Sequence, residues 1–390
     1  MSVYHQMGHH SNNLIDLPEM SSYAGAIFSP INCTESEAAE QIGEARISRK
    51  NFEIIFDPQL YVPASERGKL QKWAYFPKDV DSAEVSSSAW WTALNKKLAG
   101  ACQKLSADSV CSPVVIPKVF DDKYYSTCTR ASTELLNLVK PFKMDVLQTL
   151  LVNTPQLASN DRSLEIASIV SQTDASRIYL VVEANTSPRR ELSDENELVG
   201  LMRLVNALER NSIKVLVAFC SSELLLWKAA GAHGCASGKF FNLRRFSKQR
   251  FEGISAKGGG QMPYWFEEGL LAFLRQNDLV RIRRSGILSA ASQANPFGQE
   301  ILANLDEALR NGTKPTPWLK NSWRQFLYWF ADVEGRLSRS EVTPESLLAT
   351  ADANWSSLDK AKSLMLEREN NGVWVRAWMN ALNGYNTYQE

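Results

Sequence analysis

The sequence predicts an α/β fold, a (β/α)8 barrel of the TIM type followed by a C-terminal helical extension. The first observation is a repeat, in which short apolar and β-branched runs end in small, polar or charged residues. The second is that helical stretches separate these runs, and strands that alternate with helices pair in parallel. The third is a change after Phe246, where the chain becomes mostly helical in pattern and rich in Trp. Because chemistry lies at the C-terminal strand ends of such barrels, few residues are candidates.

Seven segments carry strand character. They are residues 24–31, 52–61, 109–117, 145–153, 177–185, 214–222 and 234–241. Helices are predicted between them, most clearly at 191–211, where apolar residues recur at helical spacing. A standard barrel needs an eighth strand, which we expect either near the N-terminus or around residues 285–292.

The chain is expected to have three parts. Residues 1–20 are polar and contain histidines, which predicts a flexible arm, while 21–300 form the barrel and 301–390 a helical, Trp-rich subdomain. A long connection, residues 62–88, combines Pro, Gly and Ser with several aromatic residues. We expect it to be ordered, either over the barrel mouth or as an excursion packed on the surface.

Composition excludes several classes of protein. The formal net charge is +0, so a whole-protein basic field for nucleic acid is absent, although local basic patches remain possible. The apolar runs are shorter than the ~18 residues of a membrane span, and the N-terminus lacks a signal-peptide pattern. None of the six cysteines forms a CxxC pair. We therefore expect a cytoplasmic protein with reduced thiols, no metal, no cofactor and no membrane association.

Asp57 is the first candidate catalytic residue. It follows a fully apolar strand segment and precedes Pro58, so it falls at a barrel strand end. There a carboxylate can act as a general base or accept a hydrogen bond from a ligand. Gln59 and Tyr61 lie beside it and would shape the pocket. The alternative is that Asp57 caps a loop or pairs with an arginine.

Other strands supply further candidates. Gln148 lies inside a strand, where it either pairs with the edge of a nucleobase or is satisfied by neighbouring side chains. Glu183, a candidate catalytic carboxylate, and Asn185 end the next strand and either bind a polar ligand or pair with following arginines. Ser221 and Ser222 precede a predicted helix, whose N-terminus could bind phosphate.

A dense basic stretch follows the strand at 234–241. Lys239, Asn242, Arg244 and Arg245 fall within a few residues, at the loops that often hold phosphate in barrels. The upstream glycine of a Walker A motif is missing, so a nucleoside triphosphatase is disfavoured. Two alternatives remain, a solvated basic loop and an unrelated barrel enzyme in which Lys239 is a reactive Schiff-base amine.

A glycine-rich segment, residues 258–268, is expected to close on a ligand. Gln261 and Trp265 are its candidate binding residues, the tryptophan as a stacking surface. Glu267 and Glu268 are adjacent, so on a predicted helix they point about 100° apart. We expect one of them to contact the ligand and the other to be solvated.

The order of these motifs resembles that of tRNA-guanine transglycosylases, over roughly residues 24–246. FEIIFDPQLY corresponds to the family's strand ending in a base-contacting Asp, VLQTLLV to its strand with a base-reading Gln, and GCASGKFFN to the strand of its catalytic Asp. The resemblance implies a barrel that handles a 7-deazaguanine, a nucleotide or a nucleic-acid base. It assigns Asp57 as base or acceptor, Gln148 as base reader, and Lys239 with Arg244 as phosphate contacts.

Two departures from the family pattern change this expectation. Ala236 and Ser237 stand where the nucleophilic Asp belongs, and no cysteine follows Cys235 to build the family's zinc cluster. The resemblance therefore implies a divergent branch, and such branches are associated with bacterial DNA modification and anti-phage defence. Two hypotheses follow, a transglycosylase-like enzyme and a catalytically inactive barrel that works as a binding or scaffold subunit. A protein partner or a homo-oligomer is compatible with both.

Overall fold

The computed structural model describes residues 3–11, 14, 16–80, 85–159, 161–252, 262–283, 285–360 and 372–388. The chain divides into two compact units. Unit 1 comprises residues 1–189 and 196–256, and unit 2 comprises residues 190–195 and 257–390. The boundary between the two units therefore falls between residues 256 and 257. The sequence predicted that the barrel continues to residue 300. The interposed glycine-rich stretch belongs in part to the undescribed residues 253–261.

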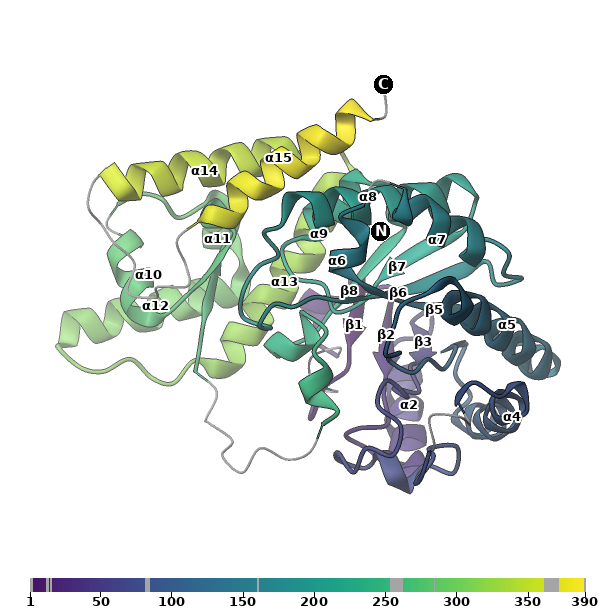
Figure 1. Ribbon diagram of the computed structural model, residues 1–390. Helices are drawn as coiled ribbons and strands as arrows, with labels where there is room; N and C mark the ends of the chain where they lie inside the picture. Colours follow the sequence, from purple (N-terminus) through teal and green to yellow (C-terminus); the bar gives the residue numbers. More distant parts are fainter. Residues whose placement is uncertain are drawn as a thin grey trace. The chain divides into compact units, whose positions relative to one another are not determined.

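Unit 1 is a closed barrel of parallel strands, each paired with the next (Figure 1). The strands are β1 (Val3–Gln6), β2 (Gly25–Phe28), β3 (Glu53–Phe56), β4 (Ser109–Cys111), β5 (Asp145–Asn153), β6 (Arg177–Glu183), β7 (Lys214–Val217) and β8 (Gly234–Ser237). β8 closes the barrel on β1, with His5 opposite Ser237. This topology confirms the predicted (β/α)8 fold.

β1 is the eighth strand, and it lies in the segment that was expected to be a flexible arm. That expectation is wrong for residues 3–6, which pair with both β2 and β8. The four-residue strand VYHQ is too short, and too rich in polar side chains, to stand out as apolar. The backbone N–H and C=O groups of β1 pair with β2 and β8, which are distant in the sequence. A pattern of neighbouring residues does not reveal such pairing.

Helices cover the outside of the barrel. They are α2 (Glu35–Ser48), α4 (Ser88–Leu105), α5 (Asp122–Val139), α6 (Thr154–Leu157), α7 (Arg162–Val170), α8 (Glu195–Arg210) and α9 (Leu224–Ala229). α2 begins at a capping box, in which Thr34 and Glu37 satisfy each other's backbone amides. In α5, Tyr125, Leu135 and Val139 are among the residues buried on one face. The long segments between strands therefore fold as predicted from their apolar spacing.

A polar layer occupies the N-terminal ends of the strands. The Arg177 guanidinium pairs with Glu53 at 2.7 Å and with Asp145 at 3.0 Å. The Tyr4 hydroxyl donates to Glu53 at 2.6 Å, and the Ser109 hydroxyl donates to the same carboxylate at 2.8 Å. One guanidinium thus holds two carboxylates in the barrel floor, opposite the end at which barrels carry their chemistry.

Unit 2 is a two-stranded antiparallel sheet with helices. It contains β9 (Trp265–Glu267), the 3-10 turn η6 (Glu268–Leu270), β10 (Ala272–Leu274), α10 (Gln276–Arg283), α11 (Ala290–Ala294), α12 (Pro296–Asn311), α13 (Leu319–Ser338), α14 (Pro344–Lys360) and α15 (Val373–Thr387). The Gln325 amide satisfies the backbone N–H and C=O of Phe266, so α13 seals one edge of β9. Among the described residues, no helix is long and apolar enough to cross a membrane.

Candidate functional site

Asp57 lies at the centre of a buried polar cluster at the C-terminal end of the strands. It follows β3 directly, and its side chain is buried. It accepts hydrogen bonds from the Tyr61 hydroxyl at 3.0 Å, the Gln59 backbone N–H at 3.0 Å and the Tyr179 hydroxyl at 3.4 Å. The Tyr179 hydroxyl also lies 3.2 Å from Gln6 Oε1. Three strands, β1, β3 and β6, thus converge on one carboxyl.

Burial raises the pKa of Asp57 to about 6, although the hydrogen bonds from Gln59 and Tyr61 and the positive charge of Arg250 all act in the opposite direction. Burial also lowers the pKa of Arg250 to about 10, so this guanidinium remains a cation at neutral pH. A carboxyl whose pKa lies near neutrality can both release and accept a proton under ordinary conditions. The site is therefore equipped for general acid–base chemistry.

The cluster contains carboxamide groups that are not satisfied. Among the described residues, neither amide atom of the buried Gln59 side chain has a hydrogen-bond partner, and neither does Gln6 Nε2. Gln59 also has a φ of 50°, and Phe219, just beyond β7, has a φ of 51°. Left-handed backbone is unfavourable for such residues and recurs at ligand sites. Buried amides are normally hydrogen-bonded to protein or to ordered water, so these groups are candidates for contact with a bound polar molecule.

Aromatic side chains pack around Tyr61, whose hydroxyl donates to Asp57. The Tyr61 ring lies 4.9 Å from that of Phe246 and 5.1 Å from that of Phe251, and Phe219 lies 5.4 Å from Phe246. We call these four rings the aromatic cap. Ser65, in the long connection after β3, donates a hydrogen bond to the carbonyl of Phe251. The long connection is thus ordered at this point and touches the cap.

Gln148 does not belong to this cluster. Its Nε2 donates to Thr129 Oγ1 of α5 at 2.9 Å, so the side chain points to the helix layer. The neighbouring Thr149 is the register partner of Tyr179, which faces the barrel interior. Because side chains alternate along a strand, Gln148 lies on the other face. The structure therefore contradicts its predicted role as base reader.

Among the described residues, the other strand-end candidates form no hydrogen bond with Asp57, and their own partners are different residues. Glu183 is partly buried and accepts from Asn153 Nδ2 at 3.4 Å, while Asn185 is exposed. Ser221 and Ser222 are buried, and Ser222 Oγ has no hydrogen-bond partner in the described part of the chain. The helix that follows them, α9, is a short one of 6 residues. A phosphate site at its N-terminus therefore has no structural support.

Most basic side chains of the stretch after β8 bind other groups of the protein itself. Arg244 is buried and donates to the carbonyls of Gly238 and Lys239 at 2.9 and 3.0 Å. Arg245 is buried 3.5 Å from Glu223. Lys239 Nζ donates to the His10 carbonyl at 2.9 Å, and burial lowers its pKa to about 8. The ammonium thus contacts the loop after β1, whereas a Schiff-base role would require it to point into the barrel.

Asn242 and the glycine-rich segment complete the predicted set. Asn242 is partly buried, and its Oδ1 has no hydrogen-bond partner among the residues described. Gln261 lies outside the described residues. Trp265 is buried in unit 2, where its Nε1 donates to Glu267 at 2.9 Å, so its ring is not an exposed stacking surface.

Glu267 and Glu268 differ from the prediction, because they lie at the end of β9 and the start of η6, not on a helix. Both are buried, where one was expected to be solvated. Glu267 accepts from the backbone amides of Gly269 and Ser289 at 2.9 and 2.8 Å. Burial nevertheless raises its pKa to about 7.

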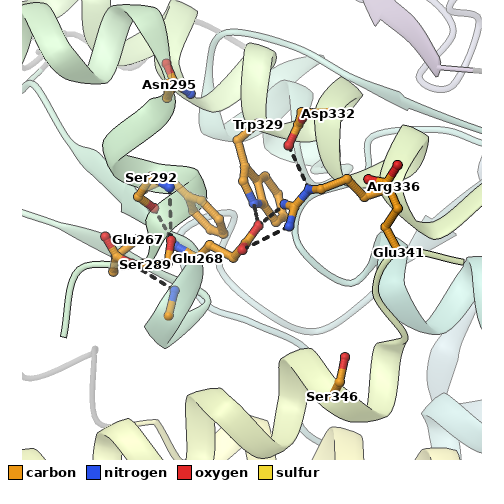
Figure 2. Close-up of polar contacts among 12 residues, drawn as sticks. Glu267, Glu268, Ser289, Ser292, Asn295, Trp329, Asp332, Arg336, Glu341 and Ser346 are labelled. Atoms are coloured by element: carbon orange, nitrogen blue, oxygen red, sulfur yellow. Dashed lines mark hydrogen bonds and ion pairs between the residues drawn. The ribbon is translucent and has the colours of Figure 1, made fainter. Parts of the chain in front are cut away.

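Glu268 has different partners (Figure 2). It pairs with Arg336 and accepts from Trp329 Nε1 at 2.8 Å, and Arg336 also binds Asp332 at 2.8 Å. All of these partners lie in unit 2. The two glutamates thus hold the β9–η6 turn to α11 and α13, which is a structural role.

Sequence reasoning missed Gln6, Tyr179 and Arg250. Tyr179 carries a recoverable signal, because it shares a strand face with Glu183, which was recognised as a strand-end residue. Gln6 was missed together with β1. Arg250 follows the last barrel strand at a distance, and only the folded chain brings its charge near Asp57. In the described residues, no group of three or more His, Cys, Asp and Glu side chains could hold a metal ion.

Comparisons with known proteins do not assign this chain to a family. No family model matches the chain, and no curated protein matches it. Similar solved structures include tryptophan synthase from Pyrococcus furiosus (15% identity, 61% of this chain and 86% of that chain, TM-score 0.35). They also include a chitinase from Pseudoalteromonas aurantia (12%, 62% and 95%, 0.39) and an AP endonuclease from Brucella melitensis (13%, 64% and 96%, 0.36). Likenesses this distant carry no argument about activity.

Proposed function

We propose that unit 1 binds a small, planar, polar molecule of the nucleobase class at its barrel mouth, with Asp57 as the group that exchanges a proton with it. The observation that carries this proposal is the buried carboxyl of Asp57, which accepts from the Gln59 backbone N–H, together with the buried and unsatisfied carboxamide of Gln59 itself. A carboxamide offers one donor and one acceptor side by side, which matches the edge of a heterocyclic base.

The surroundings support a planar ligand. The aromatic cap offers rings against which a flat molecule can stack. Arg250 supplies a positive charge that stabilises the ionised form of Asp57. A pKa near 6 allows Asp57 to take a proton from a ring nitrogen or to return it. Deazapurines belong to this class of ligand, and nothing in the site selects them over other bases.

The proposed chemistry is binding with proton transfer, without a covalent enzyme intermediate. Ala236 and Ser237, which occupy the nucleophile position of the resembled family, lie on β8. Ala236 has no reactive group, and the buried Ser237 lies opposite His5 in the register of β1. A covalent base exchange therefore lacks its nucleophile.

A second candidate function is an inactive barrel that serves as a binding subunit. The aromatic cap favours it, because the rings of Tyr61, Phe246 and Phe251 pack against one another. A flat molecule can stack between these rings only after they separate. If the cap never opens, the polar cluster is a buried network and the barrel is inert.

Isothermal calorimetry with free purine and pyrimidine bases tests the two candidates. The wild type is expected to bind at least one base, and Asp57→Asn and Gln59→Leu are expected to weaken that binding about tenfold or more. Gln148→Leu is the matched control, because that buried glutamine faces the helix layer. Equal losses in Gln59→Leu and Gln148→Leu, or no binding by the wild type, would favour the inactive barrel.

A further inference from the structure

A group of basic side chains lies on two loops beyond the C-terminal ends of β1 and β8. His9 and His10 are exposed, and their ring centroids are 3.9 Å apart. Lys239 Nζ donates to the His10 carbonyl at 2.9 Å and lies 4.7 Å from the centroid of the Phe240 ring. Residues far apart in the chain thus bring two imidazoles and an ammonium together.

The backbone that carries the two histidines is fixed. The Gly8 N–H donates to Ser11 Oγ at 2.9 Å. A Cβ at Gly8 would lie 2.7 Å from Leu243 Cδ1 and 3.2 Å from the Phe240 ring, so a larger residue there would require these side chains to shift. His10 itself has a φ of 51°. The loop therefore presents both rings in a defined place against the turn after β8.

The electrostatic field at these rings is positive. Burial and the charges of His10, Lys239 and Lys69 lower the pKa of His9. Lys69 is itself paired with Glu37 at 2.6 Å, so part of its charge is offset. A metal cation would be repelled by the ammonium groups, whereas an anion would gain from all of them.

We propose that His9, His10 and Lys239 form a binding site for a tetrahedral oxyanion, the phosphate group of a small phosphorylated molecule. Imidazolium and ammonium groups make charge-assisted hydrogen bonds to phosphate oxygens. The position agrees with the general tendency of barrels to bind phosphate on the loops after the last strands. The site shares no residue with the Asp57 cluster. Its test is therefore independent of the function proposed above.

Histidine NMR tests this site directly, because the chain contains 4 histidines. Sulfate is the first probe, since its charge is constant across the useful pH range. At fixed ionic strength, sulfate is expected to shift the Cε1–H signals of His9 and His10 and to raise the pKa of His9, while His233 is unchanged. Sulfate is expected to bind more tightly at pH 6 than at pH 8, because burial lowers the pKa of Lys239 to about 8 and this amine is fully protonated only at the lower pH.

Two variants make the test decisive. Lys239→Met is expected to weaken sulfate binding about tenfold. Lys228→Met is the matched control, because Lys228 Nζ also donates to a backbone carbonyl, that of Ala232 at 2.8 Å, but lies outside the cluster. The signals of His5 and His233 report whether each variant stays folded. Equal binding by Lys239→Met and the wild type, or shifts as large at His233 as at His9, would overturn the proposal.

The source of the phosphate is resolved by a second series, measured by calorimetry with His9→Asn/His10→Asn as the reference. Inorganic phosphate and a nucleoside monophosphate are both expected to bind the wild type more tightly than this variant. Asp57→Asn is expected to bind inorganic phosphate like the wild type, which separates this site from the barrel-mouth proposal. Binding of an oligonucleotide without binding of either small phosphate would refute the site as a small-molecule site.

Discussion

At the scale of single residues, the carboxyl of Asp57 is subject to opposing effects. Three hydrogen bonds and a nearby arginine favour its ionised form, while complete burial favours the neutral form. Burial dominates, because the loss of hydration of a carboxylate exceeds what a few neutral donors return. The result is a pKa of about 6, which the sequence position alone does not give.

The raised pKa of Asp57 predicts a pH-dependent stability. Between pH ~4 and ~6 the unfolded chain ionises this carboxyl while the folded chain keeps the proton, so stability is lost as pH rises through this window. Asp57→Asn removes this loss, which is on the order of 2–3 kcal/mol when complete. Urea unfolding of both proteins from pH 4 to pH 7 measures it. A stability difference that does not change with pH would show that the pKa of Asp57 is ordinary.

Gln59 combines an unfavourable backbone conformation with a buried, unsatisfied side chain. Gln59→Gly is therefore expected to stabilise the protein by about 1 kcal/mol, because glycine adopts a positive φ freely. The same variant is expected to lose base binding. Thermal unfolding and calorimetry check the two effects together, and a destabilised Gln59→Gly variant would contradict this account.

At the scale of elements, the aromatic cap joins the connection after β3 to the turn after β8. Phe251→Ala is expected to cost about 3–5 kcal/mol, as truncation of a buried phenylalanine does. Water would then reach Asp57, and its pKa would fall from about 6 toward the ordinary value. Carboxyl 13C NMR measures that pKa. Phe326→Ala, in unit 2, is the control, expected to destabilise without moving the pKa of Asp57.

The turn after β9 depends on a buried ion pair. Glu268→Gln is expected to destabilise the protein by about 1–3 kcal/mol, because the variant loses a charge-assisted hydrogen bond to Arg336 in a buried place. Glu341→Gln is the matched control, since its pair with Arg339 is exposed and screened by solvent. Denaturant unfolding should show no measurable change for this control, and equal effects in both would contradict a structural role for Glu268.

At the scale of the whole molecule, the formal net charge of +0 argues against binding of nucleic acid through bulk charge. The basic side chains around His9 are a local feature suited to a single phosphate. We therefore expect no retention of duplex or single-stranded DNA in a gel-shift assay at about 150 mM salt. A basic DNA-binding domain serves as the positive control, and tight, salt-sensitive retention would contradict the prediction.

The sequence by itself determined the barrel and three residues of the Asp57 cluster. Short apolar strands alternating with helices leave few solutions other than a parallel barrel, and seven of the eight strands followed from that pattern. Asp57 and its neighbours Gln59 and Tyr61 were identified because a strand end is a local property. The eighth strand was expected near the N-terminus or around residues 285–292, and β1 confirms the first alternative. Its four residues carry no periodic signal, so the sequence did not assign them individually.

Only the tertiary structure decided which side chains meet. Gln148 and Tyr179 lie on neighbouring strands, yet the alternation of side chains sends one to α5 and the other to Asp57. Arg244 and Arg245 were predicted from the sequence to contact a ligand. In the structure both are buried, Arg244 donates to a backbone carbonyl, and Arg245 pairs with Glu223. The physical reason is common to all of these cases. Which face a side chain occupies, and what burial does to its charge, depends on elements distant in the chain.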